Sequence, residues 1–332
     1  MFQALYLSKL LILIITVNFA SIDLGTNSFR ILVARLQKNN KIKFIYKKSV
    51  ITRLGKDFNI STKTLAIDSV SRGFEVLNAF SSVLKDYKVS NIRAVATSVV
   101  RESKNHELFT DCASEIIGTN IEVITGSVEA QLTAIGVLKS IENINKNKLI
   151  VDIGGGSTEF AVVDRYDYIN SLLSIKLGVV KITEIYNVNK ILADEDIVQI
   201  SEYISHFIEK EMVGADFSAN QISEIVVTAG TPTTLTAMDL GLKEYNHSNT
   251  NGHILYKKNI VKIFGKICSL NSKERLKLIG LREGRENLII PGTLIILYLL
   301  GRYNKDKIVV SGGGLLEGII YSEADKYFNN II

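Results

Sequence analysis

Cysteine, proline and histidine are scarce in this sequence of 332 residues, and their scarcity excludes several classes of protein. Cys112 and Cys268 lie far apart and form no Cys-x-x-Cys pair, which argues against a disulfide scaffold and against a structural zinc site. The four histidines show no metal-ligand spacing. The two prolines, Pro232 and Pro291, argue against a proline-rich linker. A chain so poor in cysteine suits the reducing cytoplasm.

Length and composition indicate a globular protein of two domains. At about 150 residues per domain, 332 residues correspond to about two domains. Hydrophobic residues make up 46% of the chain and charged residues 22%, which excludes a disordered, collagen-like or coiled-coil protein. The net charge of +5 is compatible with a polyanionic ligand but selects none.

Residues 1–20 carry one charge and an apolar run, and they allow three interpretations. They could form a signal peptide cleaved near Ala20, or a short membrane anchor, although about 20 apolar residues are usually needed to cross a membrane. In the third interpretation 17–24 is a buried strand, preceded by an apolar extension of uncertain status over 1–16. Cleavage after Ala20 would cut that strand in half, so we favour the strand. We therefore expect a cytoplasmic protein with no stable membrane association.

Predicted strands alternate with predicted helices, which indicates an α/β fold. Turn-forming residues separate the first three strands, and Ser127 is a plausible N-cap for one of the helices. The predicted strands are 17–24, 29–36, 41–50, 92–97, 120–124, 149–153, 160–164, 168–175, 225–228 and 308–311. The predicted helices are 62–85, 127–138, 194–212, 257–268, 286–300 and 315–327, with a further helix after the strand at 225–228.

The opening pattern of the chain returns 129 positions later, which predicts a duplicated fold. Ile22-Asp-Leu-Gly-Thr-Asn-Ser28 aligns with Val151-Asp-Ile-Gly-Gly-Gly-Ser157, and both segments lie between two predicted strands. Aspartate at the end of a buried strand can hold a metal ion or orient water. Glycine lets backbone N–H groups approach a phosphate oxygen, and serine or threonine adds a hydroxyl donor. Two such loops facing each other would clamp one polyphosphate in a cleft between the domains.

Two further loops of small residues follow strands and precede helices, at 228–234 and 311–314. In the first, the amides of Gly230 and Thr231 could bind an anion at the helix N-terminus. Neither loop has the pattern GxxxxGK[ST] or GxGxxG, so the sequence argues against a P-loop NTPase and against a Rossmann dehydrogenase.

Paired Asp-Gly loops in a duplicated order resemble those of the acetate and sugar kinase, Hsp70 and actin superfamily, whose domains are ribonuclease H-like. Within that superfamily the chain resembles the exopolyphosphatase/guanosine pentaphosphate phosphohydrolase (Ppx/GppA) family, in its short two-domain form. Seven stretches spread over about 18–325 carry the resemblance. They are Ser21-IDLGTNSF-Arg30, Ala96-TSVV-Arg101, Ile124-TGSVE-Ala130, Val151-DIGGGST-Glu159, Leu177-GVVKIT-Glu184, the segment from Gly280 through Arg285 to Gly292, and the segment from Ser311 to Gly318.

The resemblance implies two duplicated actin-like domains with a phosphate-binding cleft between them. Residues 17–126 plus 315–332 would form the N-terminal domain, because the last helix usually packs back on the first domain in this architecture. Residues 127–314 would form the C-terminal domain.

The resemblance also implies hydrolysis of a terminal phosphoanhydride by water, with Mg²⁺ as cofactor. Glu129 matches the catalytic glutamate that positions the attacking water as general base, and Arg101 matches a phosphate-binding arginine whose planar fork suits two phosphate oxygens. The metal-binding candidates are Asp23, Asp152 and Glu159. The phosphate-binding candidates are Gly25, Thr26, Asn27, Ser28, Gly154, Gly155, Gly156, Ser157, Thr158, Gly230 and Thr231.

The chain departs from the family pattern at several positions. Its sequence does not decide between two candidate substrates. The departures are Val128, Gln131, Asn287, Gly312, Gly313 and Leu316. Because Glu129 is retained, we expect activity to persist. We favour an exopolyphosphatase that removes the terminal phosphate of inorganic polyphosphate, with guanosine pentaphosphate (pppGpp) hydrolysis in the stringent response as the alternative. A kinase of the superfamily, or a non-catalytic sensor of (p)ppGpp or polyphosphate, is the less favoured interpretation. We expect no nucleic-acid partner, and a homodimer stays open.

Overall fold

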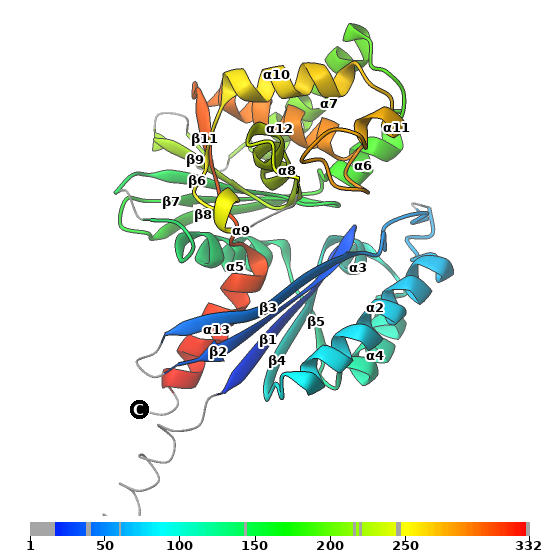
Figure 1. Ribbon diagram of the computed structural model, residues 1–332, viewed down its shortest axis with the longest axis vertical. Coiled ribbons are helices and arrows are strands. Elements are labelled where there is room, and N and C mark those ends of the chain that lie inside the picture. The colour runs from blue at the N-terminus through cyan, green and yellow to red at the C-terminus, as the bar shows by residue number, and fades with distance from the viewer. Residues whose placement is uncertain are drawn as a thin grey trace, which may run out of the picture.

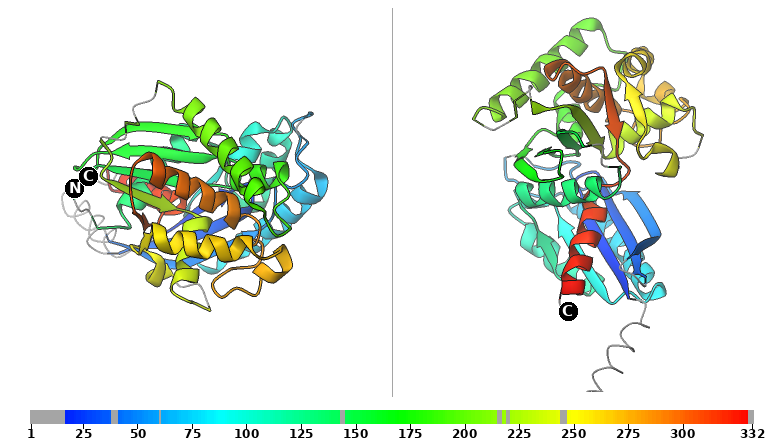
Figure 2. Two further views of the ribbon diagram at one scale, coloured as in Figure 1. Left: turned by 90° about the horizontal axis from the view of Figure 1, so that it is seen from above. Right: turned by 90° about the vertical axis from the view of Figure 1, so that its left-hand side faces the viewer.

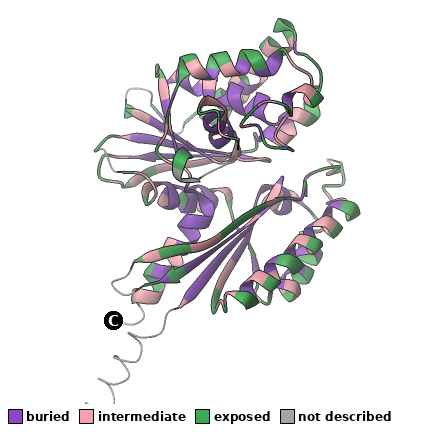
Figure 3. Cartoon of the chain, viewed as in Figure 1, coloured by how far each residue is buried: buried purple, intermediate pink, exposed green. Residues whose placement is uncertain are grey.

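The computed structural model describes residues 17–37, 41–59, 61–142, 145–214, 217–218, 221–243 and 247–329. The predicted apolar extension over 1–16 lies outside the described residues. Figure 1 shows two β-sheets, one above the other, each with helices on its faces. Figure 3 shows that the central strands of both sheets are largely buried, whereas the edge strand Ile42–Ile51 and the outer faces of the helices are largely exposed.

The first sheet has five strands in the order β3-β2-β1-β4-β5. The strand β1 lies at its centre, antiparallel to β2 and parallel to β4. All seven residues of β1 are buried, as expected for a strand with apolar neighbours on both faces. The elements are β1 (Asn18–Leu24), β2 (Ser28–Leu36), β3 (Ile42–Ile51), α2 (Ile67–Asp86), β4 (Asn91–Ala96), α3 (Ser98–Glu102), α4 (His106–Ile117) and β5 (Ile121–Val123).

The second sheet has six strands in the order β10-β11-β9-β6-β7-β8. Its central strand β6 is antiparallel to β7 and parallel to β9. The elements are α5 (Gly126–Leu138), β6 (Lys148–Ile153), β7 (Thr158–Val163), β8 (Ile169–Ile175), α6 (Val179–Ile185), α7 (Asp194–Glu211), β9 (Glu224–Thr228), α8 (Gly230–Asp239), α9 (His247–Thr250), β10 (Ile254–Tyr256), α10 (Lys257–Cys268), α11 (Ser272–Arg275), α12 (Ile289–Arg302), β11 (Lys307–Val310) and α13 (Leu315–Asn329).

The two sheets repeat one pattern, which confirms the duplication predicted from the sequence. The run β3-β2-β1-β4 of the first sheet corresponds to β8-β7-β6-β9 of the second, with the same parallel and antiparallel pairings. Asp23 pairs with Arg30 across β1 and β2, and Asp152 pairs with Glu159 across β6 and β7. The two aspartates therefore occupy equivalent places in the two sheets.

Each sheet carries one of a pair of helices that pack on each other. The last helix, α13, packs through Leu316, Ile320 and Ala324 on the face of the first sheet opposite to α2 and α4. Figure 2 shows it beside the opening strands of the chain. The helix α5 packs through Ala134 and Val137 on the second sheet, opposite to α7, α10 and α12. The helices thus repeat the duplication of the sheets.

Most predicted elements are present, but the start of one helix and the N-cap of another differ from the prediction. The helix predicted over 62–85 begins at Ile67, because 61–64 form a turn closed by a bridge between Asn59 and Thr64. Ser127 is not the N-cap of α5. The cap is Thr125, whose hydroxyl accepts a hydrogen bond from the Val128 amide at 3.3 Å.

The N-terminal strand predicted over 17–24 is present as β1 (Asn18–Leu24). Among the described residues, none of the helices has both the length and the apolar character needed to cross a membrane.

Candidate active site

A small polar cavity of about 70 Å³ lies between the two sheets. Both repeated loops, the start of α3, the first turn of α5 and the start of α8 contribute to its wall. Its lining consists of Asp23, Gly25, Thr26, Asn27, Ser28, Arg30, Thr97, Ser98, Glu129, Asp152, Ile153, Gly154, Gly155, Gly156, Ser157, Ala229, Gly230 and Arg285. The structure therefore brings together most of the candidates chosen from the sequence.

The two repeated loops fold into the same tight turn. Gly25 N donates to the Ser28 carbonyl oxygen at 3.2 Å, and Gly154 N donates to the Ser157 carbonyl oxygen at 3.0 Å. A Cβ atom on either glycine would lie within 2.9 Å of the carbonyl oxygen that closes the turn. Glycine is required at both positions because no side chain fits inside the turn.

The loop of the second half touches the first half at Gly156. A Cβ atom there would lie 2.6 Å from Ser98 Oγ and 2.7 Å from Thr26 Oγ1. The hydroxyl groups of one half therefore lie against the backbone of the other. A phosphate group between the loops would receive donors from both halves.

Three buried polar atoms of the first loop have no hydrogen-bond partner among the described residues. They are Asp23 Oδ1, Thr26 Oγ1 and Asn27 Nδ2. A buried polar atom without a partner costs about 1–3 kcal/mol, so three of them in one loop point to a missing ligand. The hydroxyl and amide groups suit phosphate oxygens, whereas the carboxylate oxygen suits a cation.

Several carboxyl groups share this buried space. Burial raises the pKa of Glu129 to about 7; the negative charges of Asp23 and Asp152 act in the same direction, and Arg101 opposes them. Burial and the charge of Glu129 raise the pKa of Glu159 well above its ordinary value. Burial also raises the pKa of Asp152, against the effect of Arg30. A protein tolerates such a cluster when a cation or a proton is shared among its members.

Arg101 and Glu129 form an ion pair beside the cavity. Arg101 Nη1 donates to Glu129 Oε2 at 3.0 Å and to the Ile124 carbonyl oxygen at 2.8 Å. The guanidinium group does not itself line the cavity. Its contact with Glu129 can orient that carboxylate. With a pKa near 7, Glu129 can accept a proton from water at neutral pH.

Two arginines at this cavity were not among the candidates chosen from the sequence. Arg30 holds Asp23 Oδ2 through Nε at 2.6 Å and Nη2 at 2.5 Å. Arg285 packs its guanidinium group on Gly230, where a Cβ atom would lie 2.1 Å from Nη1. Both residues stand inside the stretches that carry the family resemblance. Their charge is visible in the sequence, but their direction depends on tertiary structure.

Some predicted residues point elsewhere. Thr158 Oγ1 donates to the Leu177 carbonyl oxygen at 2.5 Å, and Glu159 Oε1 accepts from Ser174 Oγ at 2.8 Å. The side chain of Thr231 packs against Gly292 of α12. The side chains of these three residues contribute nothing to the lining of the cavity.

The loop at 311–314 is closed by its own neighbours. The amides of Gly312, Gly313 and Gly314 donate to Asn251 Oδ1, Ser311 Oγ and Glu317 Oε2 respectively. These amides are therefore not available to an anion in this arrangement.

The residues present fit a magnesium ion better than a transition metal. Within the described ranges there is no group of three or more His, Cys, Asp or Glu side chains arranged to hold a metal. Mg²⁺ needs few carboxylates, since it keeps several waters and binds substrate phosphates. Asp23, with its unpartnered oxygen, and Asp152 both line the cavity and could supply them.

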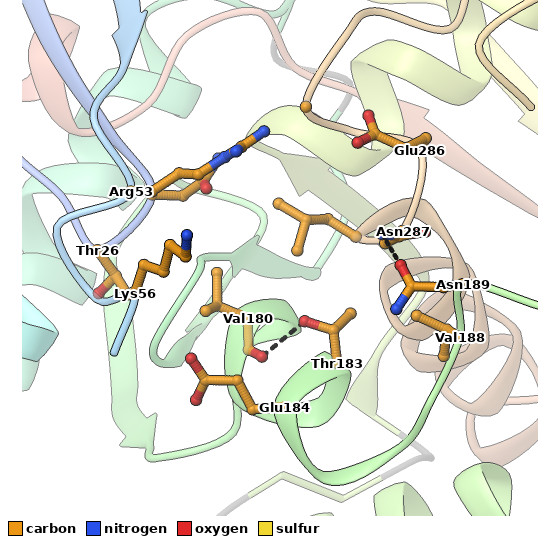
Figure 4. Close-up of a pocket in the computed structure, with 13 residues that line it drawn as sticks. Thr26, Arg53, Lys56, Val180, Thr183, Glu184, Val188, Asn189, Glu286 and Asn287 are labelled. Atoms are coloured by element: carbon orange, nitrogen blue, oxygen red, sulfur yellow. Dashed lines mark hydrogen bonds between the residues drawn. The ribbon is translucent and has the colours of Figure 1, made fainter. Parts of the chain in front are cut away.

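A larger cavity of about 320 Å³ adjoins the first and shares Thr26 and Asn27 with it. Figure 4 shows Arg53 and Lys56 on one wall, with Glu184 and Glu286 on the others. Asn287 donates through Nδ2 to Asn189 Oδ1 at 2.6 Å. A ligand bound at the loops could extend into this cavity.

Comparison with known proteins finds relatives in sequence and in structure. A sequence model of the Ppx/GppA phosphatase family matches residues 32–327. A bifunctional 3-dehydroquinate synthase/phosphatase of Fusobacterium nucleatum is 32% identical over 90% of the chain and 46% of its own length. A guanosine-5'-triphosphate,3'-diphosphate pyrophosphatase of Aliivibrio fischeri is 29% identical over 93% of the chain and 59% of its own length. The chain thus spans about half the length of these curated relatives.

A solved structure of an exopolyphosphatase-like protein superimposes with a TM-score of 0.86 at 27% identity. The match covers 94% of this chain and 100% of the other. The agreement extends over both sheets, and it confirms the predicted α/β fold with two duplicated actin-like halves.

Proposed function

The chain belongs to the Ppx/GppA phosphatase family, and from that premise we propose that it is an exopolyphosphatase, which hydrolyses the terminal phosphate of inorganic polyphosphate. One observation carries the proposal. Two glycine loops, the first of which carries two unpartnered donors, face a buried carboxyl group whose pKa is about 7. Anion donors beside a general base are the parts that hydrolysis of a phosphoanhydride requires.

In the proposed mechanism the loops bind the terminal phosphate. The amides of 26–27 and 155–156, together with Thr26 Oγ1 and Asn27 Nδ2, donate to its oxygens. Glu129 Oε1 or Oε2 takes a proton from the water that attacks the phosphorus atom, while Arg101 holds this carboxylate in place. Arg30 keeps Asp23 oriented. Bound at Asp23 and Asp152, Mg²⁺ would neutralise charge on the phosphate oxygens.

We further propose that the domains are 17–126 plus 315–332 and 127–314. The packing of α13 on the first sheet and of α5 on the second supports this division. We also assign the protein to the cytoplasm, which is supported by its two cysteines, Cys112 and Cys268, both free thiols.

Guanosine pentaphosphate is the second candidate substrate, and the cavity of Figure 4 favours it. That space of about 320 Å³ has amide side chains and the apolar side chains of Val180 and Leu288 in its lining, which suits a nucleoside. The relative from A. fischeri that is 29% identical carries the name of such an enzyme.

The test measures phosphate released from long-chain polyphosphate and from guanosine pentaphosphate with Mg²⁺, in wild type and in Glu129→Ala. We expect faster release from polyphosphate, lowered by about 10²–10⁴-fold in the variant, which is the usual contribution of a general base. Faster release from the nucleotide would make the second candidate the main one. Tight binding without release from either would indicate a sensor, and an ATP-dependent phosphorylated product would indicate a kinase.

A further inference from the structure

The active-site cavity also continues into a second space, which is lined in part by β3 and is distinct from the cavity of Figure 4. It is a cavity of about 250 Å³ that shares Arg30, Ala229, Gly230 and Arg285 with the active-site cavity. The strand β3, the start of α8 and the first turn of α13 contribute to its wall. A polymer whose end lies between the glycine loops could therefore continue into either of these cavities.

The two cavities differ in formal charge. The cavity beside β3 is lined by four cationic side chains and two carboxyl groups, whereas the cavity of Figure 4 has two of each. The first set is Arg30, Lys47, Arg282 and Arg285 with Glu283 and Glu317; the second is Arg53 and Lys56 with Glu184 and Glu286. A chain with one negative charge per phosphate is attracted more strongly by the first set.

The cations beside β3 also repel one another. Burial, together with the charges of Arg282 and Arg30, lowers the pKa of Arg285 to about 10. Within the described residues the Arg285 guanidinium group forms no hydrogen bond or ion pair. Like charges held so close are stabilised when an anion lies between them.

One of the two carboxylates is already bound internally. Glu317 Oε1 lies 2.6 Å from Lys47 Nζ, and its Oε2 accepts from Gly314 N at 2.9 Å. Lys47 Nζ also donates to the Gly312 carbonyl oxygen at 3.3 Å. An ammonium group has three N–H donors, so one of them is left to bind a ligand. The Lys47 side chain is 39% exposed, so solvent and ligands reach it.

Resting on the proposed function, we infer that the phosphate chain behind the scissile end runs through the cavity beside β3, past Arg282 and Lys47, and not through the cavity of Figure 4. Lys47 and Arg282 are then residues that determine the preference for chain length. A long polyphosphate reaches them, whereas a short one ends near the glycine loops.

The test compares binding of long-chain polyphosphate and of tripolyphosphate by calorimetry, with Mg²⁺ and the full chain carrying Glu129→Gln to prevent turnover. Lys47→Gln with Arg282→Gln removes two charges beside β3. Arg53→Gln with Lys56→Gln is the matched control, because it removes one arginine and one lysine from the other cavity. We expect the first pair to weaken long-chain binding about tenfold, tripolyphosphate binding less than about threefold, and the control to bind both ligands as its parent does.

Weaker long-chain binding in the control pair, or an equal loss for both ligands in the first pair, would overturn the inference. Since Lys47 also holds Glu317, thermal unfolding of each variant shows whether the fold is kept, and Arg282→Gln alone tests the path with an expected loss of about threefold. Phosphate release by wild type is measured separately. Its failure would overturn the proposed function, whereas the binding data would still decide the path.

Discussion

The carboxyl group of Glu129 is buried at the start of α5 and has one cation, Arg101, 3.0 Å away. Burial raises its pKa, and Asp23 and Asp152 add to that effect, so the value of about 7 is held down only by Arg101. A general base must be deprotonated to work. In the proposed mechanism, the ionisation of this one side chain therefore sets the pH range in which the site is active.

We predict that kcat/KM falls as the pH drops below about 7, by about tenfold per pH unit, and that Arg101→Met moves this acid limb to higher pH. The sign follows because removing the cation destabilises the carboxylate and raises its pKa further. Arg93→Met is the control, since Arg93 pairs with Glu122 and Glu323 outside the cavity. If the acid limb of Arg101→Met stays at the same pH as in wild type, Glu129 is not the general base.

Two helices distant in the sequence cross at glycine. A Cβ atom on Gly318 of α13 would lie 1.7 Å from the Leu132 carbonyl oxygen of α5, and one on Gly136 would lie 2.0 Å from the Gly314 carbonyl oxygen. Backbone atoms cannot move aside as a flexible side chain can. This crossing joins the helix on the first sheet to the helix on the second, with Glu129 one turn from it.

We predict that Gly318→Ala lowers the free energy of unfolding by about 3 kcal/mol, at the upper end for overpacking, because the helices must separate. Gly265→Ala in α10 is the control. A Cβ atom there meets nothing within 4 Å, so alanine should raise the stability by about 0.5–1 kcal/mol through its higher helix propensity. Urea unfolding measures both. Equal stabilities of the two variants would contradict the close crossing.

The sequence predicts an element well when the interactions that determine it lie between residues close together in the chain. The repeated loops follow from Asp, Gly and Ser at fixed spacing, and the structure places them face to face. The helix over 62–85 begins five residues late, because Asn59 and Thr64 pair across a turn that apolar periodicity does not reveal. Arg285 reaches the cavity through a packing contact with Gly230, across a separation of 55 residues. No local pattern encodes such a contact.

The candidate active site depends on how the two halves of the molecule are held together, because each half supplies part of its lining. Lys181 of α6 binds both oxygens of Glu102 of α3, at 2.9 and 3.1 Å. Glu102 Oε1 also accepts from Ser98 Oγ, and Ser98 lines the cavity. This ion pair links the two halves at the edge of the active site.

We predict that Lys181→Gln raises KM by about two- to fivefold with little change in kcat, since a partly exposed pair contributes about 0.2–1 kcal/mol. Adding Glu102→Gln should cause little further loss, because the pair is already broken. Lys190→Gln serves as control; its partner Asp196 lies in the same half. Strictly additive effects of Lys181→Gln and Glu102→Gln on KM would show that the pair does not join the halves.

The proposed Mg²⁺ site also joins the halves, because Asp23 comes from β1 and Asp152 from β6. We predict that Mg²⁺ raises the Tm of wild type, by the equivalent of about 2.7 kcal/mol at one hundred times its Kd. A chelator should abolish phosphate release, and added Mg²⁺ should restore it. Asp152→Asn should lose the Mg²⁺-dependent rise in Tm, while Asp196→Asn, on the exposed start of α7, should keep it. The opposite result would be an unchanged Tm of wild type on adding Mg²⁺, together with hydrolysis that persists in the presence of a chelator. It would mean that the buried carboxyl groups share protons and not a cation.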